Sequence, residues 1–325
     1  MKSIRTAALA LSVCVFALPV RAADYPDHSI KMIVPFAAGG GTDVLARIIA
    51  QNLNSKWGQP VVVENQPGAS GAIGTRAVMK AAPDGYTLLM ASTGALMAVS
   101  AGAEGAGPFD VNTVLTPIVI GAAPPYLLVA SPTLPVKTTA ELISYGRGKP
   151  EGLSFGSSGV GAASHLSGLL FSSETGIKLL HVPYRGTGPA VTDLLGGRID
   201  LMFAPGPVVQ QFVQSGQLKA LGVTDTRRSR FYPDVPVVAD AVSGYESIGW
   251  FGLLAPPNTP PEIVRKINDV IVAAMQTQEF RDHLATLGAE PKLQTPEEFG
   301  RYINADVAKW SKLVKDNNVQ LPGGK

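Results

Sequence analysis

The chain has 325 residues with a formal net charge of +2, and 46% of its residues are hydrophobic. A length near 300 favours two domains that each bury a core. The near-neutral charge argues against binding to nucleic acid or to an anionic membrane surface. The only cysteine is Cys14, so no disulfide, thiolate nucleophile or cysteine-ligated metal is expected in the remainder of the chain.

Residues 1–22 have the pattern of a secretory signal peptide. Lys2 and Arg5 give a basic start, an apolar run follows at 7–18, and small residues end the segment, so cleavage is expected after Ala22. The apolar run is too short to span a membrane, and the residue before Cys14 is too bulky for a lipoprotein acceptor. Cleavage removes three of 27 basic residues and none of 25 acidic ones, which leaves 24 against 25.

Beyond residue 22, short apolar runs alternate with helical patterns. Apolar strands separated by helices are typical of a parallel sheet covered on both faces, which makes the chain α/β. The predicted strands are 30–35, 61–63, 86–91, 153–156, 178–183, 199–204 and 218–224. The predicted helices are 43–53, 73–82, 164–175, 188–195, 207–215 and one that begins at 260. Capping boxes predict three helix starts: Thr138 with Glu141, Thr259 with Glu262, and Thr295 with Glu298.

The predicted linkers are the Pro- and Gly-rich stretches 102–108, 121–125 and 255–261. Two apolar runs, 115–130 and 248–255, flank the middle of the chain. If each run crosses between lobes, the first lobe is discontinuous and the second is not. The expected divisions are a signal peptide at 1–22, lobe 1 at 23–122 and 250–325, and lobe 2 at 123–249. Two crossings form a hinge with a cleft that can close on a ligand.

Two loops rich in glycine and hydroxyl residues, 35–43 and 155–165, each follow a predicted strand and precede a predicted helix. A helix N-terminus carries unsatisfied N–H groups and a positive dipole end, so it attracts carboxylates and phosphates. The two loops therefore predict two lobes that face one anionic ligand. The candidate donors are Gly39, Gly40, Gly41, Thr42, Ser157, Ser158, Gly159, Gly161 and Ser164. Asp43 is expected to be an N-cap acceptor that holds the first loop, rather than a ligand contact.

A third turn, 183–190, also lies between a predicted strand and a predicted helix. Tyr184 and Arg185 within it are candidates to close over the ligand. For Arg185 the sequence leaves two interpretations open, a ligand contact and a surface charge. His165 is likewise either a ligand contact or a residue that hydrogen-bonds a neighbouring loop.

Enzyme signatures are weak or absent in the sequence. The glycines at 39–41 lack the third glycine of a dinucleotide fingerprint, because Val44 stands there, and no GxxxxGK[ST] occurs. Ser157 and Ser158 fail the GxSxG nucleophile pattern, because Val160 replaces the second glycine. No HExxH or paired-histidine spacing predicts a metal site. We therefore expect no cofactor, no metal and no catalytic residue.

Five stretches in this order have a family-specific character. They are YPDHSIKMIVPFAAGGGTDVLAR, VVVENQPGASGAIGT, APDGYTLLM, HVPYRGTGPAVTDLLGGRIDLMF and LKALGVTDTRRSRFYPDVPVVAD. Through them the chain resembles, beyond residue 22, the periplasmic solute-binding proteins of tripartite tricarboxylate transporters, the Bug receptor family. The resemblance implies two Rossmann-like lobes joined by a two-stranded hinge, which close like a flytrap. It also implies a monomer that holds a small organic carboxylate through backbone amides, hydroxyls and ordered water, and that delivers it to large and small membrane subunits.

The resemblance also implies particular binding positions. They are Ala37, Ala38, Gly39 and Thr42 in the first loop, Ser157, Gly159, Gly161 and His165 in the second, Tyr184 and Gly186 in the third, and Phe203, Ala204 and Pro205 at the edge of the cleft. Asp193 and Asp200 also match family positions, but we expect structural roles for them, because an acid would repel a carboxylate.

The chain departs from the family pattern at 91–117, which is more apolar and richer in glycine than the polar loop of its relatives. We hypothesise that Ser92 and Thr93 donate to the distal end of the ligand there. Leu96 and Met97 would make the same wall apolar, which favours an aromatic carboxylate over citrate.

The sequence thus predicts a periplasmic receptor for a small organic carboxylate. Two alternatives remain open. A ligand sensor for a receptor kinase would use the same pocket, and a periplasmic serine hydrolase would use Ser157 or Ser158 with His165.

Overall fold

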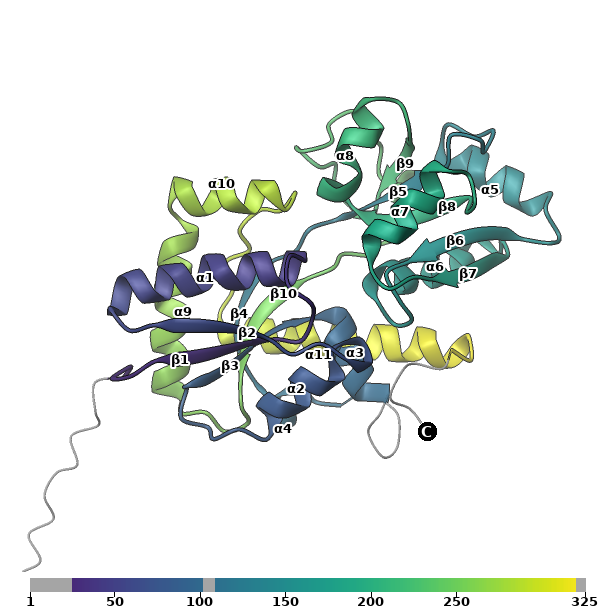
Figure 1. Ribbon diagram of the computed structural model, residues 1–325. Helices are drawn as coiled ribbons and strands as arrows, with labels where there is room; N and C mark the ends of the chain where they lie inside the picture. The colour runs from purple at the N-terminus through teal and green to yellow at the C-terminus, as the bar shows by residue number, and fades with distance from the viewer. Residues whose placement is uncertain (1–24, 102–108, 320–325) are drawn as a thin grey trace, which may run out of the picture.

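The computed structural model describes residues 25–101 and 109–319. The predicted signal peptide and the predicted linker at 102–108 lie outside the described residues. Figure 1 shows two α/β lobes, each built around its own sheet, so the predicted α/β class and two-lobed architecture are confirmed. Among the described residues, no helix combines the length and apolar character needed to cross a bilayer.

The sheet of lobe 1 has five strands in the order β2-β1-β3-β10-β4. Their bounds are β1 Ile30–Val34, β2 Val61–Asn65, β3 Thr87–Ser92, β4 Thr116–Ala122 and β10 Phe251–Ala255. The helices around it are α1 Gly41–Trp57, α2 Ala72–Met79, α3 Thr93–Ala101, α4 Val111–Val114, α9 Pro261–Met275, α10 Gln278–Thr286 and α11 Pro296–Asp316, with a short 3-10 turn at Ala69–Gly71.

The sheet of lobe 2 has five strands in the order β7-β6-β8-β5-β9. Their bounds are β5 Tyr126–Ala130, β6 Leu153–Ser157, β7 Leu179–Pro183, β8 Leu201–Pro205 and β9 Lys219–Val223. The helices around it are α5 Thr139–Arg147, α6 Ala163–Thr175, α7 Thr187–Leu195 and α8 Gly206–Gln214, with a 3-10 turn at Val238–Asp240.

Neither sheet is purely parallel, which corrects the sequence-based expectation. β1 runs parallel to β2 and β3, whereas β10 runs antiparallel to β3 and β4. In lobe 2, β6 runs parallel to β7 and β8, whereas β5 runs antiparallel to β8 and β9. The antiparallel strands β5 and β10 are the ones that the chain enters directly from the other lobe. A strand reached without a helical crossover on its own sheet is not held to the parallel direction.

The hinge consists of two short crossings, one between β4 and β5 and one that leads into β10. Pro125 of the first crossing pairs with Ile248 of the second in an antiparallel bridge. The two crossings are therefore joined by a β-bridge at the hinge.

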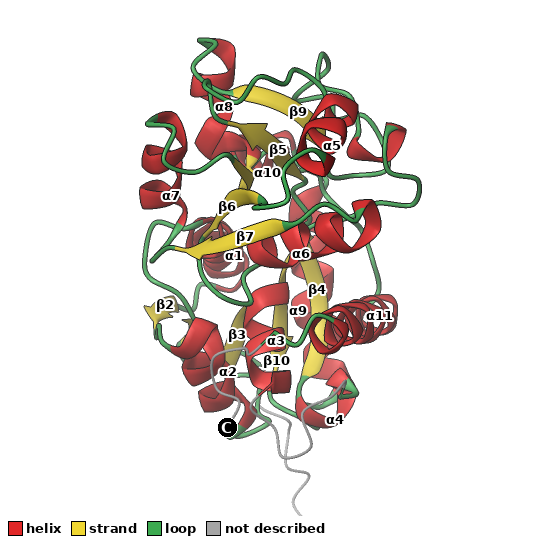
Figure 2. Ribbon diagram, turned by 90° about the vertical axis from the view of Figure 1, so that its right-hand side faces the viewer, coloured by secondary structure: helices red, strands yellow, loops and turns green. Residues whose placement is uncertain are grey.

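Both faces of each sheet are covered by helices (Figure 2). In lobe 1, Leu45 and Ile49 of α1 share a buried cluster with Ile267 and Ile271 of α9, and none of the four is more than 1% exposed. Apolar side chains spaced three and four residues apart on each helix produce this packing. A second cluster, around Trp250 and the first half of α11, covers the opposite face.

Helix α11 crosses from one lobe to the other. Phe299 and Ile303, near its start, belong to the core of lobe 1. Trp310 and Leu313, near its end, belong to the core of lobe 2. Figure 1 shows the helix extending from the region of β4 to a position beside α6.

One of the three predicted capping boxes is complete. At α11, Thr295 accepts from the backbone of Glu298, and the Glu298 carboxylate accepts from the backbone of Thr295. At α5, Thr138 caps the helix, but the Glu141 carboxylate accepts from Lys137 instead. The predicted box at Thr259 is wrong, because α9 begins only at Pro261 and the Thr259 hydroxyl donates to the Pro256 carbonyl at 2.8 Å.

Candidate functional site

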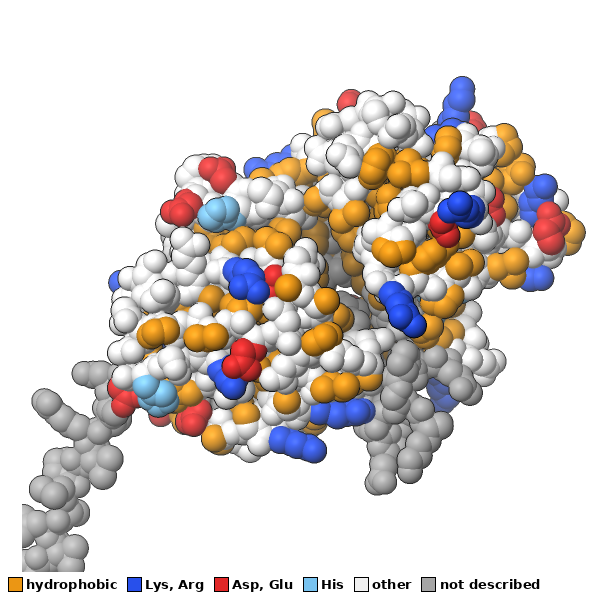
Figure 3. Space-filling model, in the orientation of Figure 1, with side chains coloured by type: hydrophobic (Ala, Val, Ile, Leu, Met, Phe, Trp, Pro, Cys, Tyr) orange, Lys and Arg blue, Asp and Glu red, His pale blue; other side chains and the backbone are white. Residues whose placement is uncertain are grey.

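A cavity of about 540 Å³, here called the cleft, lies between the lobes and against the hinge. Figure 3 shows the crevice between the two lobes. Lobe 1 contributes Phe36, Ala37, Ala38, Gly39, Gly40, Thr42, Ser70, Ser92, Thr93 and Gly94. Lobe 2 contributes Ser158, Gly159, Ala162, Ala163, Arg185, Gly186 and Thr187. The hinge contributes Tyr126, Gly249, Trp250 and Phe251.

Four helices begin in the wall of the cleft. The wall includes the N-cap residues of α1, α6 and α7, which are Gly40, Ala162 and Gly186, and the first residue of α3, which is Thr93. The starts of α1, α6 and α7 have no side-chain cap, whereas α5, α10 and α11 are each capped by a threonine. Uncapped N–H groups and four positive dipole ends therefore meet at one cavity, which is the arrangement that binds an anion.

Arg185 is the only charged residue among the described residues that line the cleft. The cleft therefore combines one full positive charge with the partial charges of the helix starts. No described lining residue is acidic, so nothing in the wall repels a carboxylate.

Asp43 holds the first loop from behind. Its Oδ2 accepts from the Gly39 N–H at 2.9 Å, and both of its oxygens accept from Arg47 at 3.0 Å. Asn65 donates to Asp43 at 3.0 Å and to the Phe36 carbonyl at 3.0 Å. Burial raises the pKa of Asp43, but the hydrogen bonds from Arg47, Gly39 and Asn65 outweigh it and hold the pKa below its ordinary value. The N-cap is Gly40, so Asp43 supports the loop from the first turn of α1 instead of from the predicted N-cap position.

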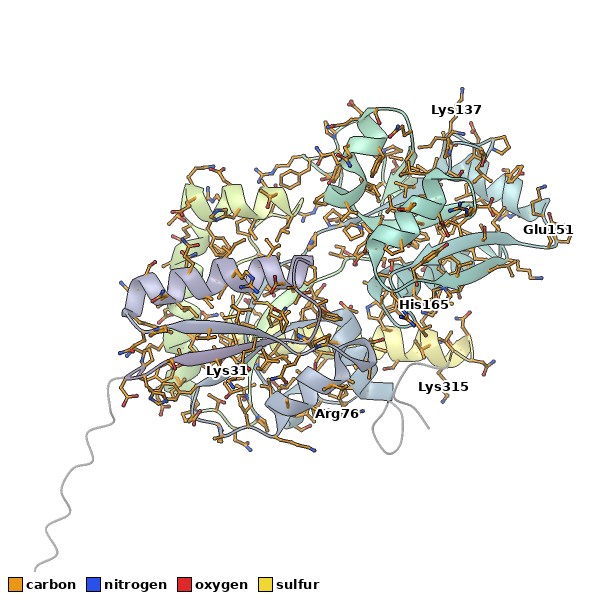
Figure 4. The ribbon with its side chains drawn as sticks, viewed as in Figure 1. Lys31, Arg76, Lys137, Glu151, His165 and Lys315 are labelled. Carbon is orange, nitrogen blue, oxygen red and sulfur yellow. The ribbon has the colours of Figure 1, made fainter. Side chains whose placement is uncertain are left out.

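His165 supports the second loop and does not line the cleft. Its Nδ1 accepts from the Gly161 N–H at 3.0 Å, and its ring stacks on His181 with centroids 3.8 Å apart. His165 is 2% exposed and lies at the end of lobe 2 that faces lobe 1 (Figure 4). Burial, with a contribution from His181, lowers the pKa of His165 to about 3, and burial lowers the pKa of His181 to about 4. Both rings are therefore neutral at physiological pH.

Ser157 is also enclosed behind the loop, with no exposed surface. Its hydroxyl donates to the Gly159 carbonyl at 3.0 Å and accepts from the Gly159 N–H at 3.1 Å. Its oxygen also lies 2.6 Å from Nε2 of His181. A hydroxyl has one donor and two acceptor positions, so these three contacts use the full hydrogen-bonding capacity of the Ser157 hydroxyl.

The predicted ligand-binding residues divide into two groups. Those that line the cleft are Ala37, Ala38, Gly39, Gly40, Thr42, Ser92, Thr93, Ser158, Gly159, Arg185 and Gly186. Those that do not are Ser157, Gly161, His165, Tyr184, Phe203, Ala204 and Pro205. The Tyr184 hydroxyl donates to Asp193 at 2.8 Å, and burial together with this bond raises its pKa to about 12. Phe203 and Ala204 have no exposed surface, because β8 buries them in the core of lobe 2.

Leu96 and Met97 lie in buried cores at 0% and 2% exposure, not in the wall of the cleft. The hypothesis that they make that wall apolar is therefore wrong. The segment after β3 forms helix α3. This helix is apolar on all sides, so its side chains are buried in the cores of the lobes.

The apolar part of the wall comes from aromatic residues that sequence reasoning missed, namely Phe36, Tyr126, Trp250 and Phe251. The last three lie at the hinge, within the two apolar runs that predicted the crossings. These three aromatic residues could have been predicted from the sequence, because chain segments that cross between two lobes lie at the floor of the cleft between them. Ser70 was also missed, and its hydroxyl donates across the cleft to the Val160 carbonyl at 3.2 Å.

Asp306 of α11 fixes part of this wall from below. Its Oδ2 accepts from Trp250 Nε1 at 2.7 Å and from the Thr93 hydroxyl at 3.2 Å. Its Oδ1 accepts from Trp310 Nε1 at 2.7 Å. Burial raises the pKa of Asp306, although these three donors act in the opposite direction. One carboxylate thus joins two residues of the cleft wall to the helix that enters the core of lobe 2.

The fold is that of a two-lobed binding protein, and the helix starts and Arg185 give its cleft a lining suited to an anion. The family model for the tripartite tricarboxylate transporter family receptor matches residues 45–319, and the chain belongs to this family. The chain is 37% identical over 308 residues to Protein BugT of Bordetella pertussis, with 94% of each chain covered.

Solved structures agree with this assignment. The Rhodopseudomonas palustris protein Rpa4515 with adipate superposes with a TM-score of 0.78 at 35% identity, covering 91% of this chain and 99% of that one. MatC from the same organism, with bound malate, superposes with a TM-score of 0.77 at 31% identity, covering 89% and 100%. The periplasmic binding protein BugD has a TM-score of 0.78 at 35% identity, covering 91% and 99%.

Proposed function

We propose that the protein is a periplasmic receptor that captures a small organic carboxylate in the cleft and delivers it to a tripartite tricarboxylate-type membrane transporter. The observation that carries this proposal is the meeting of four helix N-termini at one cavity, three of them uncapped, with Arg185 as its one charged residue. Such a set of donors binds carboxylates and phosphates, and the adipate and malate in two structures of relatives favour a carboxylate here.

The ligand would be a dicarboxylate or an aromatic acid. One carboxylate accepts from the N–H groups at the uncapped starts of α1 and α6, next to Gly40 and Ala162, and Arg185 is available to a second. The carbon skeleton packs against the aromatic residues at the hinge. Two relatives of known structure hold adipate and malate, which have two carboxylates each.

The proposed mechanism is closure of the lobes on the ligand. Residues of both lobes line the cleft, so a ligand that touches both stabilises the closed arrangement by its differential affinity for that arrangement. The large and small membrane subunits would then recognise the closed form of a monomer. We also propose the divisions expected from the sequence, with an exported chain cleaved after Ala22, lobe 1 at 23–122 and 250–325, and lobe 2 at 123–249. In this division α11 belongs to lobe 1, although its C-terminal half packs on lobe 2.

We propose that the protein is not a hydrolase. The Ser157 hydroxyl is buried and already uses its donor and both acceptor positions. The Ser158 hydroxyl lies 3.1 Å from the Ser164 hydroxyl, and no histidine lies within hydrogen-bond distance of it among the described residues. The sensor alternative uses the same cleft and differs only in the partner that recognises the closed form.

The proposal is tested by thermal shift followed by calorimetry with aliphatic and aromatic carboxylates, amino acids and nicotinate. A ligand that binds only the folded state raises the Tm by mass action. We expect one carboxylate class to do so, and we expect Arg185→Gln to weaken that binding. Arg147→Gln, on the exposed side of α5, is the matched control and leaves binding unchanged. No shift with any carboxylate, in protein shown to be folded and free of copurified ligand, would refute the proposal.

A further inference from the structure

A second cavity, of about 280 Å³, lies at the hinge and shares no lining residue with the cleft. We call it the hinge cavity. Its walls come from both lobes, namely the loop 225–231 that follows β9 and the loop 288–292 between α10 and α11. Ala123, Pro125 and Ile248 of the two hinge crossings complete it.

The hinge cavity is rich in positive charge. Its charged lining residues are the cations Arg227, Arg228, Arg230 and Lys292 and the acids Asp225 and Glu290. The cleft, in contrast, has a single charged lining residue. Four cations against two acids leave the lining with a net charge of +2, which favours an anion.

Two of the four cations already have acidic partners. Arg230 Nε lies 2.5 Å from Glu290 Oε1, an ion pair that joins lobe 2 to lobe 1. Arg228 lies 3.8 Å from Asp240. Asp225 accepts from the backbone N–H of Arg227 at 3.0 Å, which occupies one of its oxygens.

The other two cations have no acidic partner among the described residues. The guanidinium of Arg227 makes no hydrogen bond or ion pair with any described residue. The ammonium of Lys292 lies over the Tyr302 ring, 4.3 Å from its centroid, and no described carboxylate lies within 4.0 Å of it. One of these cations comes from lobe 2 and the other from lobe 1, so an anion between them would bridge the lobes.

We propose that the hinge cavity binds a small oxyanion with two negative charges, of the size of phosphate or a short dicarboxylate, between Arg227 and Lys292. A planar guanidinium can pair with two oxygens of such an anion, and an ammonium adds a point charge. The cavity, of about 280 Å³, has room for a ligand of this size.

Binding there acts on the arrangement of the lobes, because loops of both lobes line the cavity. The cleft depends on the same arrangement. An anion in the hinge cavity therefore changes the affinity of the cleft for its own ligand, and the cleft ligand changes the affinity for the anion by the same factor. This inference does not depend on which ligand the cleft takes.

The test is calorimetric titration of the whole protein with inorganic phosphate and with malonate, at constant ionic strength set by chloride. We expect a saturable site that loses at least tenfold in affinity in Arg227→Gln and in Lys292→Gln, while any second site for malonate, in the cleft, is unaffected by these changes. Arg76→Gln and Lys137→Gln are the matched controls, since Figure 4 places these side chains at the far edges of lobe 1 and lobe 2, and they leave the affinity unchanged. Unchanged Tm in chloride buffer shows that each variant is folded.

Three outcomes would overturn the proposal. One is the absence of saturable binding in the wild-type protein for both anions. Another is wild-type affinity in the double variant of Arg227 and Lys292. The third is loss of anion binding in Arg185→Gln with the hinge variants unaffected, because that result would place the anion in the cleft.

Discussion

The replacement Asp306→Asn offers the sharpest test of how the cleft wall is held. The two carboxylate oxygens of Asp306 accept from different indoles, Oδ2 from Trp250 and Oδ1 from Trp310. An asparagine has the same shape but only one acceptor oxygen, and its NH₂ group would face the second indole N–H. One donor therefore loses its partner whichever way the amide turns.

The magnitude follows from this count. Loss of a hydrogen bond to a charged group, with a buried donor left unpaired, costs about 1.5–3 kcal/mol. Removal of the charge returns part of this cost, because burial disfavours the ionised form of Asp306. We therefore expect Asp306→Asn to lower the free energy of unfolding by about 2 kcal/mol. It should also weaken ligand binding, because Trp250 and Thr93 line the cleft.

The assay is urea unfolding in a double-mutant cycle with Trp310→Phe, which removes one of the two competing donors. In that background the amide can turn its oxygen toward Trp250, so Asp306→Asn should cost less than about 1 kcal/mol. Trp57, on α1, remains as a fluorescence reporter in every variant. An equal cost of Asp306→Asn in both backgrounds would refute the argument from acceptor number.

Three further predictions concern the loops behind the cleft. Asp43→Asn removes the charge that orders the Gly39 loop, so calorimetry should show about a tenfold loss of ligand affinity, equal to about 1.4 kcal/mol; unchanged affinity would mean that the loop is rigid without it. The pKa values of His165 and His181, about 3 and about 4, lie below the ordinary 6.5, so the unfolded chain takes up protons first and stability is complete above pH 6.5 and falls as the pH drops toward 4. For His165 the slope of the free energy of unfolding against pH approaches ~1.4 kcal/mol per pH unit. Denaturant midpoints at pH 7.5 and 5.0 measure this slope. Equal midpoints at the two pH values would contradict the claim that both rings are neutral in the folded protein. Ser157→Ala should cost about 1–3 kcal/mol of stability by leaving buried donors unpaired, with no change in any ester hydrolysis; selective loss of a hydrolytic activity would instead revive the enzyme alternative.

Local patterns predicted the parts of the fold that depend on neighbouring residues. The start of α11 was predictable because Thr295 and Glu298 satisfy each other's backbone without help from the rest of the chain. The alternation of strands and helices followed from hydrophobic periodicity for the same reason. The failed cap at Thr259 shows the limit, since two consecutive prolines moved the helix start by one residue.

Features that depend on residues far apart in the sequence were not predicted. The direction of β5 and β10 depends on how the chain crosses between lobes, which no local window contains. Helix α3 was not predicted, because its residues are apolar on all sides and show no helical periodicity.

The residues that line the cleft were predicted best in the two glycine-rich loops. The loops around Gly39 and Ser158 line the cleft because a strand, a glycine turn and a helix start place N–H groups at one edge of a sheet. Side chains were predicted less well, because their direction depends on tertiary contacts. His165 turns away from the cleft to accept from Gly161, and Tyr184 turns to donate to Asp193.

The position of β10 in the centre of the first sheet has a consequence for how the chain folds. Until residues 251–255 join it, the strands β2, β1 and β3 have no link to β4. The five strands of lobe 2, in contrast, lie within residues 126–223 and are all present much earlier along the chain. Contacts between residues far apart in sequence form slowly, because a long loop must close first. We therefore expect lobe 2 to gain structure first and lobe 1 to close last, with α11 then joining the cores of both lobes.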